Sequence, residues 1–521
     1  MESPGRSRFL AQMTRWWVPG LALVLPVAWM LALGMDANWD LRNYHLYNPH
    51  AWFTGRDAID IAPAQLQSWH NPLLDVPLYL ITASGADARW ASAWLTLPAI
   101  VALLIVFRLQ QLLSPSNPAP ASQFALGLLV TTGAAFGSTM GLTMNDGFVA
   151  AAMLGSLWLL VRDGDDFAGR HRWLLAGLLA GAITGLKLAA IFYCVALAAA
   201  SVVQGTWLQR LRRLAALSLG GAVGFAITYG YWGWRLFRSH GNPVFPYFNN
   251  FFRSPDVLLQ DWNDPRFRAE SLLDALSSPF QLLQRTSHFS EMPIRDPRLL
   301  LGLVGLVALY IFARKQSGAL RQKFAVLLSF TVVAWLAWVF QYGIYRYAIV
   351  LEVLGCLALV LLLQKLPRAR NIALVVALLV VSADTKRPNW GRMRSPEPMA
   401  GIAAVNIPGN SVVVIASGEP LAYLALGLPE GVPIIAVSNN LMTPGQCTQL
   451  QQRARARLLA HQGPSWLLST DPAHDKQAQP VLLDNYGLEP DGACVQADSS
   501  IGTAVFCPYR RASASAPASK C

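Results

Sequence analysis

Long apolar runs, separated by short polar loops as far as about Val381, constrain the fold of this 521-residue chain more than any other feature. A helix that spans a bilayer needs about 20 mostly apolar residues. Only 13% of the residues are charged, against about 25% in soluble domains. We therefore expect a mainly α-helical, polytopic membrane bundle with about eleven spans. The expected spans are residues 16–34, 90–107, 124–142, 148–161, 173–186, 189–203, 214–234, 299–313, 324–340, 348–363 and 372–382.

Lysine and arginine in the short loops orient these spans. If the N-terminus is cytoplasmic, the cytoplasmic side receives Arg6, Arg8, Arg15, Arg162, Arg170, Arg172, Arg210, Arg212, Arg213, Arg314, Lys315, Arg321, Lys323, Lys365, Arg368 and Arg370. The opposite short loops hold few cations. In a soluble protein, the net charge of +12 would suggest nucleic acid as a partner. Because much of the excess lies in these loops, we expect a bilayer and no nucleic acid.

This orientation predicts the domain organisation. Residues 1–384 form the membrane domain, whose outward loops are 35–89 and 235–298; a linker at 385–410, an outward α/β domain at 411–511 and a disordered tail at 512–521 follow. A cleaved signal peptide is the competing interpretation of residues 16–34, but the apolar core is too long for one. We expect a multi-pass protein of the bacterial inner membrane, with a cytoplasmic N-terminus and a periplasmic C-terminal domain.

The C-terminal part has the pattern of a small soluble domain. Residues 411–416, 432–437 and 465–469 read as strands, and 421–426 and 448–461 read as helices. This alternation predicts an α/β domain. Cys494 and Cys507 flank a hairpin-like turn, so we expect a disulfide between them, with two free thiols as the alternative.

The first outward loop opens with two carboxylates, Asp36 and Asp40, followed by Arg42, Tyr44 and His45. If this stretch is helical, Asp36, Asp40 and Tyr44 share a face. A half-shielded carboxylate there is suited to act as a general base. A solvated loop with capping aspartates is the alternative interpretation.

A second polar group closes the same loop. It contains His70, Asn71 and Asp75, and it precedes an apolar run. The tryptophans of the loop, Trp39, Trp52 and Trp69, are either an aromatic belt or a stacking surface for a sugar.

Three further charged residues lie near span ends. Asp146 is in an Asn-Asp-Gly turn, which ordinary turn chemistry also explains. Lys187 separates two apolar runs, and Arg346 opens another. Charges at membrane depth are functional candidates, and together the two cations would neutralise a lipid-linked phosphate. Snorkelling to the interface is the alternative.

Taken in order, these features resemble the GT-C superfamily of membrane glycosyltransferases, which includes the protein O-mannosyltransferases and the lipid A aminoarabinose transferases. The resemblance lies in Asp40 with Tyr44 four residues later, Gly55 downstream, the stretch from His70 to Tyr79, and Asp146 as the second outward acidic position. The Asp-Glu pair usual in the family is absent, since Leu41 follows Asp40.

The resemblance implies a GT-C-like fold and inverting transfer of a sugar from a polyprenyl-phosphate carrier to an extracytoplasmic acceptor, which is an envelope glycan, lipid or protein. Asp40 and Asp146 would be the catalytic pair. Asp36, Arg42, Tyr44, His45, His70, Asn71, Asp75, Lys187 and Arg346 would bind substrate. No cofactor is certain, and a divalent metal, Mg²⁺ or Mn²⁺, stays open. A membrane transporter or lipid flippase is the alternative function.

Overall fold

The computed structural model describes residues 4–114, 116–162, 167–315, 318–366, 368–394 and 401–512. It is mainly helical, with 61% of its residues in helices, and has a small C-terminal sheet domain. The chain divides into two compact units. Unit 1 comprises Met1–Leu33, Leu95–Gly230 and Asp264–Trp390, and unit 2 comprises Gly34–Trp94, Tyr231–Asn263 and Gly391–Cys521.

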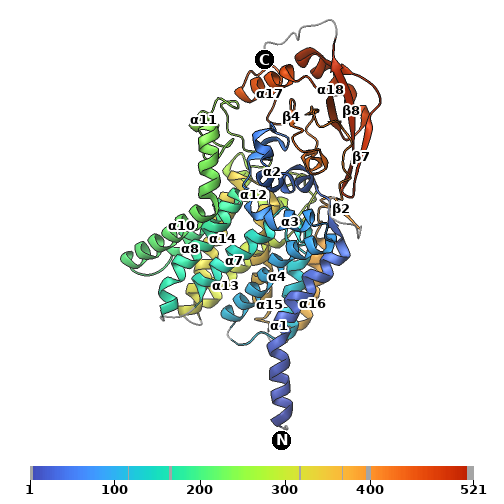
Figure 1. The fold of residues 1–521 in the computed structure, drawn as a ribbon. Helices are drawn as coiled ribbons and strands as arrows, with labels where there is room; N and C mark the ends of the chain where they lie inside the picture. Colours follow the sequence, from blue (N-terminus) through green and yellow to red (C-terminus); the bar gives the residue numbers. More distant parts are fainter. Residues whose placement is uncertain are drawn as a thin grey trace. The chain divides into compact units, whose positions relative to one another are not determined.

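Unit 1 is a bundle of apolar helices. Its longer helices are α1 (Pro4–Leu33), α5 (Pro120–Thr131), α7 (Asp146–Val161), α8 (Phe167–Leu186), α9 (Ile191–Ser201), α13 (Arg298–Ala313), α14 (Gly318–Gln341), α15 (Ile349–Leu363) and α16 (Arg370–Asp384) (Figure 1). Its short helices are α6 (Phe136–Thr139), η5 (Leu188–Ala190), α12 (Leu272–Gln281) and η6 (Tyr345–Ala348). Two helices, α4 (Ala88–Leu113) and α10 (Trp207–His240), run from one unit into the other.

Four helical segments among the described residues are long and apolar enough to cross a membrane. They are Ala88–Leu113, Trp207–His240, Gly318–Gln341 and Tyr345–Leu363. The remaining expected spans coincide with helices that do not meet both criteria, such as Arg298–Ala313. The apolar helices therefore indicate a membrane protein, while a total of eleven spans stays a prediction.

One predicted span is not a continuous helix, so that prediction is wrong. Within residues 124–142, α5 ends at Thr131 and the short α6 begins only at Phe136. The carboxylate of Glu352 accepts hydrogen bonds from the amides of Ala135 (2.6 Å) and Phe136 (2.9 Å), and Asp296 accepts one from Ala134 (2.8 Å). Buried backbone donors need partners, so these two carboxylates stabilise a helix break that apolar composition does not reveal.

Helices α8 and α10 approach each other closely through glycine. A Cβ atom added at Gly177 would meet the backbone of Leu217, and one at Gly181 would meet the backbone of Gly221. Small residues allow such close packing in apolar bundles, where van der Waals contact between helices replaces hydrophobic burial.

Unit 2 contains a six-stranded mixed sheet whose main path is β4-β3-β5-β8-β6. The central β3 (Val412–Ile415) pairs in parallel with β4 (Ile434–Ala436) and β5 (Ser465–Ser469). These are the three strands predicted from the sequence. The long strand β8 (Gly502–Arg511) pairs antiparallel with β5, with β6 (Leu488–Pro490) and with β7 (Val495–Ser499).

Helices and two short strands complete unit 2. The elements are β1 (Met35–Asp36), η1 (Leu41–His45), α2 (Tyr47–Thr54), η2 (Arg56–Ala58), η3 (Gln65–Trp69), η4 (Leu73–Asp75), α3 (Val76–Ala83), α11 (Asn249–Phe252), β2 (Arg392–Met393), η7 (Ala422–Gly427), α17 (Gln449–Ala460) and α18 (Pro472–Tyr486). The predicted helix at 448–461 is confirmed as α17, and the one at 421–426 is the 3₁₀ helix η7.

The loop at residues 35–89, which the sequence predicts to face outward, is packed onto this sheet. Ile61 forms a parallel bridge with Ile435 on β4, and Arg56 pairs with Asp60 at 3.0 Å. The carboxylate of Asp60 also accepts the hydroxyl of Tyr47 (2.9 Å) and the amide of Ile434 (2.7 Å). Burial raises the pKa of Asp60, although Arg56 opposes the shift. The loop thus folds together with the C-terminal domain.

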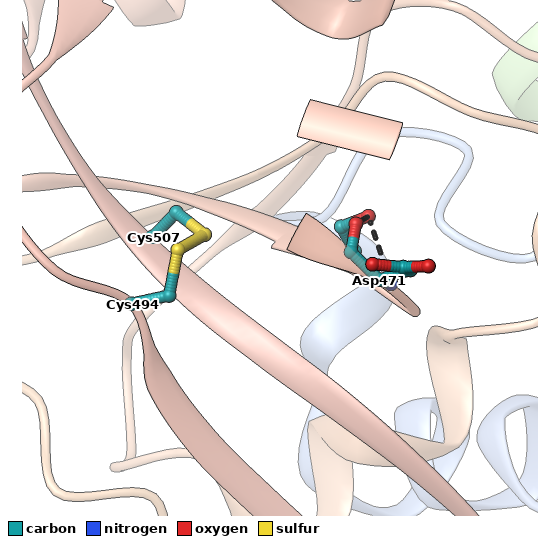
Figure 2. The surroundings of a disulfide bond; sticks show 4 residues. Asp471, Cys494 and Cys507 are labelled. Atoms are coloured by element: carbon teal, nitrogen blue, oxygen red, sulfur yellow. Dashed lines mark hydrogen bonds between the residues drawn. A yellow bond between two sulfur atoms is a disulfide. The ribbon is translucent and has the colours of Figure 1, made fainter. Parts of the chain in front are cut away.

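Figure 2 shows the disulfide that joins Cys494 to Cys507. It closes the β7–β8 hairpin, as the cysteine spacing predicts. Cys447 of unit 2 is disulfide-bonded as well, whereas Cys194 and Cys356, in the helices of unit 1, are free thiols. The predicted tail at 512–521 lies outside the described residues, apart from Ala512.

Candidate functional site

The stretch that contains Asp40 is a distorted helix rather than a regular one. The side chain of Asn38 accepts the amide of Leu41 (2.7 Å) at its start, and residues Leu41–His45 form a π-helix. Single π-turns are rare and occur often at functional sites. Asp40 is half-buried immediately before this π-helix.

Asp36 does not share a helical face with Asp40 and Tyr44, so that expectation is wrong. Asp36 lies in β1, where it pairs with Arg392 of β2, and its carboxylate accepts the amide of Asn38 (2.8 Å). The pairing partner is hundreds of residues away, and local sequence gives no sign of it.

Buried polar atoms without a hydrogen-bond partner gather in the same stretch. Within the described part of the chain they include Arg42 Nε, Asn43 Oδ1, His45 Nε2 and Asn48 Oδ1. The guanidinium of Arg42 lies against the β7–β8 turn, since a Cβ added at Gly502 would be 3.2 Å from Arg42 Nη1. Most buried polar groups in folded proteins are satisfied, so these four atoms are candidates for contacts with a polar ligand.

Aromatic rings adjoin this cluster at His45. Tyr44 contacts His45 and His70, with ring centroids 4.0 and 5.1 Å apart. His70 Nε2 is 2.9 Å from the hydroxyl of Tyr247. The structure therefore brings together Tyr44, His45 and His70 as the sequence suggested, and adds Tyr247 from the second long loop.

His45 also contacts Asp75, which belongs to the second polar group of this loop. Its Nδ1 lies 2.8 Å from the carboxylate of Asp75, and both side chains are almost fully buried. The contact is close, but it is not aligned as a hydrogen bond. Asn71 lies in the turn before, where its side chain accepts the amide of Leu73 (3.1 Å).

A second cluster lies inside unit 1 and consists of Asp146, Lys187 and Arg346. The carboxylate of Asp146, only 2% exposed, forms ion pairs with Lys187 and with Arg346, the latter at 3.4 Å. Lys187 Nζ also donates to the carbonyl of Met144 (2.5 Å). Lys187 and Arg346 are 16% and 12% exposed, so neither is a freely solvated surface cation.

Helix ends position all three residues. Asp146 begins α7 after Asn145, whose φ is +62°, a conformation that asparagine tolerates better than most residues. Lys187 is extended between α8 and η5, and Arg346 lies in η6 before α15. The ring of Tyr347 contacts both cations, with Lys187 Nζ 5.0 Å and the Arg346 guanidinium 4.8 Å from its centroid.

Sequence reasoning missed a chain of side-chain contacts in unit 2 that is centred on His240. Trp69 Nε1 donates to His240 Nε2 (3.0 Å). An indole nitrogen can only donate, so Nε2 must carry the lone pair and Nδ1 the proton, which faces Asp256. Arg453 of α17 pairs with the same carboxylate (2.8 Å). Burial acts to raise the pKa of Asp256, but His240 and Arg453 outweigh it and lower that pKa overall.

Sequence reasoning also missed the buried charges of unit 1. Arg298 pairs with Asp296 (3.0 Å), and both are almost completely buried. Only the fold shows that they meet Glu352 at the break after α5. A charged residue inside an apolar run was the available signal, because such positions are rare in membrane segments.

Among the described residues, no three His, Cys, Asp or Glu side chains are grouped so as to hold a metal ion. Searches of protein-family models, curated proteins and solved structures found no match to this chain.

Proposed function

We propose that this protein is a membrane glycosyltransferase that moves a sugar from a polyprenyl-phosphate carrier to an acceptor outside the cytoplasm, with inversion at the anomeric carbon. The observation that carries the proposal is the convergence of Lys187 and Arg346 on Asp146 inside a helical bundle. Two cations held together at membrane depth suit the phosphate of a lipid-linked donor.

The acceptor side of the reaction is assigned to unit 2. An acceptor hydroxyl is a poor nucleophile and needs a base, and Asp40 takes this role. Arg42, Tyr44, His45 and His70 lie in or beside the adjoining π-helix, where unsatisfied polar atoms and aromatic rings suit a sugar. Asn71 and Asp75 close the same loop.

The proposed orientation has eleven spans in the bacterial inner membrane, with unit 2 in the periplasm. Cysteine chemistry supports it. The disulfides involve Cys494, Cys507 and Cys447, all in unit 2, whereas Cys194 and Cys356 in unit 1 are free. Disulfides persist in oxidising compartments such as the periplasm.

A transporter or lipid flippase is the second candidate, and one observation favours it. The chain breaks between α5 and α6 and again at Lys187. Interrupted membrane helices with buried charges often line transport sites.

The test compares Asp40→Asn with Asp87→Asn, a control in the same loop whose carboxylate pairs with the exposed Arg89 (2.7 Å). Membranes of a deletion strain that carries each variant are analysed for polyprenyl-phosphate sugar and for under-glycosylated envelope material. The loss of a general base lowers a rate by about 10²–10⁴, so Asp40→Asn should accumulate the carrier while Asp87→Asn does not. Normal carrier levels in both variants, with normal protein abundance, would favour the transporter.

A further inference from the structure

We infer that Asp146 is the counter-ion that lets a phosphate site formed by Lys187 and Arg346 release its product. The inference rests on the proposed function, and it gives Asp146 a positioning and charge-setting role in place of a direct catalytic one. The ligand class is a lipid phosphate, which enters as a diester and leaves as a monoester.

Both carboxylate oxygens of Asp146 contact cations. Its carboxylate is 2% exposed, and Lys187 contacts Oδ1 while Arg346 contacts Oδ2. Each oxygen faces one of the two cations, and a side chain that is only 2% exposed leaves little access for an acceptor hydroxyl. Asp146 is therefore poorly placed to remove a proton from an acceptor and well placed to hold Lys187 and Arg346 together.

The charges of these three side chains sum to +1. A sugar phosphodiester carries one negative charge, so the loaded site is neutral. Transfer breaks the bond between the sugar and the phosphate oxygen and joins the sugar to the acceptor oxygen, while the acceptor proton goes to the base. The carrier is left as a monoester, which carries about two negative charges above its second pKa near 6.

Asp146 acts differently on these two ligands. Coulombic repulsion scales with the product of the charges, so the repulsion between Asp146 and the phosphate doubles when the diester becomes a monoester. Without Asp146 the same two cations would present a charge of +2 and would retain the dianionic product. The carboxylate thus weakens product binding more than donor binding.

Other contacts should keep the two cations in place when the carboxylate of Asp146 is replaced by a neutral amide. Tyr347 contacts both of them, and Met144 accepts a hydrogen bond from Lys187. Asp146→Asn preserves the size of the side chain and one acceptor oxygen while it removes the charge, which makes it the appropriate variant.

The experiment measures the binding of two probes, farnesyl phosphate and farnesyl methyl phosphate, to the full-length protein in phosphatidylcholine nanodiscs at about pH 8, where the monoester is dianionic. The probes share a lipid chain and differ in charge. In Asp146→Asn we expect the diester to bind about tenfold tighter and the monoester about a hundredfold tighter than in the wild type, because the second gain is twice the first in free energy.

The matched control is Asp384→Asn, which removes a carboxylate paired with Arg295 (2.8 Å) elsewhere in unit 1. It should change neither affinity by more than about twofold. The double variant Asp146→Asn/Lys187→Gln returns the summed charge to +1 and should restore the wild-type ratio of the two affinities. This comparison remains informative if the single variant folds poorly.

The outcomes separate the inference from the proposed function. If the wild type binds both probes no better than Lys187→Gln does, the lipid-phosphate site is absent and the proposed function fails. If the wild type binds both probes and Asp146→Asn leaves their ratio unchanged, only the counter-ion role is wrong. A loss of both affinities in Asp146→Asn, equal to that in Lys187→Gln, would also overturn the counter-ion role.

Discussion

The buried ion pair of unit 1 offers the sharpest stability test, through the substitution Arg298→Met. The guanidinium of Arg298 is 1% exposed and donates to Asp296 (3.0 and 3.1 Å). It also donates to Thr385 Oγ1 (2.6 Å), Thr132 Oγ1 (3.0 Å) and the carbonyl of Leu129 (3.1 Å). Methionine fills similar volume but leaves these acceptors, including one buried carboxylate, without their donor.

The expected cost follows from that uncompensated charge. Breaking a buried pair by removing one partner costs about 3–5 kcal/mol, and Glu352 adds a second carboxylate to the same environment. The matched control is Arg314→Met at the other end of α13. There the guanidinium is exposed and lies 6.0 Å from the ring centroid of Tyr310, a contact that contributes about 0.5–1 kcal/mol.

The assay is the unfolding of the full-length protein in one detergent, followed by tryptophan fluorescence and by loss of the monodisperse peak. The double variant Asp296→Asn/Arg298→Met should recover part of the stability, because it removes the unpaired charge while the introduced asparagine can still accept the amide of Ala134. Equal losses for Arg298→Met and Arg314→Met would refute the reasoning, as would a double variant less stable than Arg298→Met alone.

Three further predictions concern unit 2 and the topology. Replacing Cys494 and Cys507 by serine should cost about 3 kcal/mol in unfolding experiments, with Cys194→Ser as the neutral control, and freely alkylated Cys494 and Cys507 in wild-type membranes would contradict the pairing. Burial, and to a lesser degree Arg56, lowers the pKa of His50 from 6.5 to about 4. Because the unfolded state then binds the proton more readily, stability should fall as the pH decreases from about 6.5 to about 4. His50→Gln should flatten that part of a stability–pH curve, and an unchanged curve would show that His50 does not titrate there. Reporter fusions at Ser116 and Gly318 should score cytoplasmic and one after Pro408 outside, and a cytoplasmic score after Pro408 would remove the expected span at 372–382.

Much of the secondary structure could be predicted because its signals are local. The β-branched segments at 411–416 and 432–437 form the parallel strands β3 and β4, since each is buried on both faces and needs a continuous apolar run. The spacing of Cys494 and Cys507 likewise reflects one hairpin. Of the three strands beyond β5, the β7–β8 pair was indicated only as a hairpin, and β6 was missed because a strand of three residues carries no periodicity.

The candidate site could be predicted only as a set of residue types. The order Asp40, Tyr44, His45 and His70 suggested one polar loop, and the loop does gather Tyr44, His45 and His70. No signal in the local sequence predicted that Asp36 would pair with β2 or that Leu41–His45 would form a π-helix. The contact between Tyr247 and His70 was equally unpredictable. These features depend on contacts between segments far apart in the chain.

By itself, the sequence determined that this is a mainly helical, apolar chain with a small sheet domain, because hydropathy and side-chain periodicity act over a few turns or a few strand residues. Only the tertiary structure decided which charges meet. Asp146 is 41 residues from Lys187 and 200 from Arg346, and burial makes isolated charges so unfavourable that the fold must bring such partners together. The same requirement accounts for the helix break after Thr131, where amides 134–136 face Asp296 and Glu352. Composition shows that such charges need partners, and the packing of distant helices selects them.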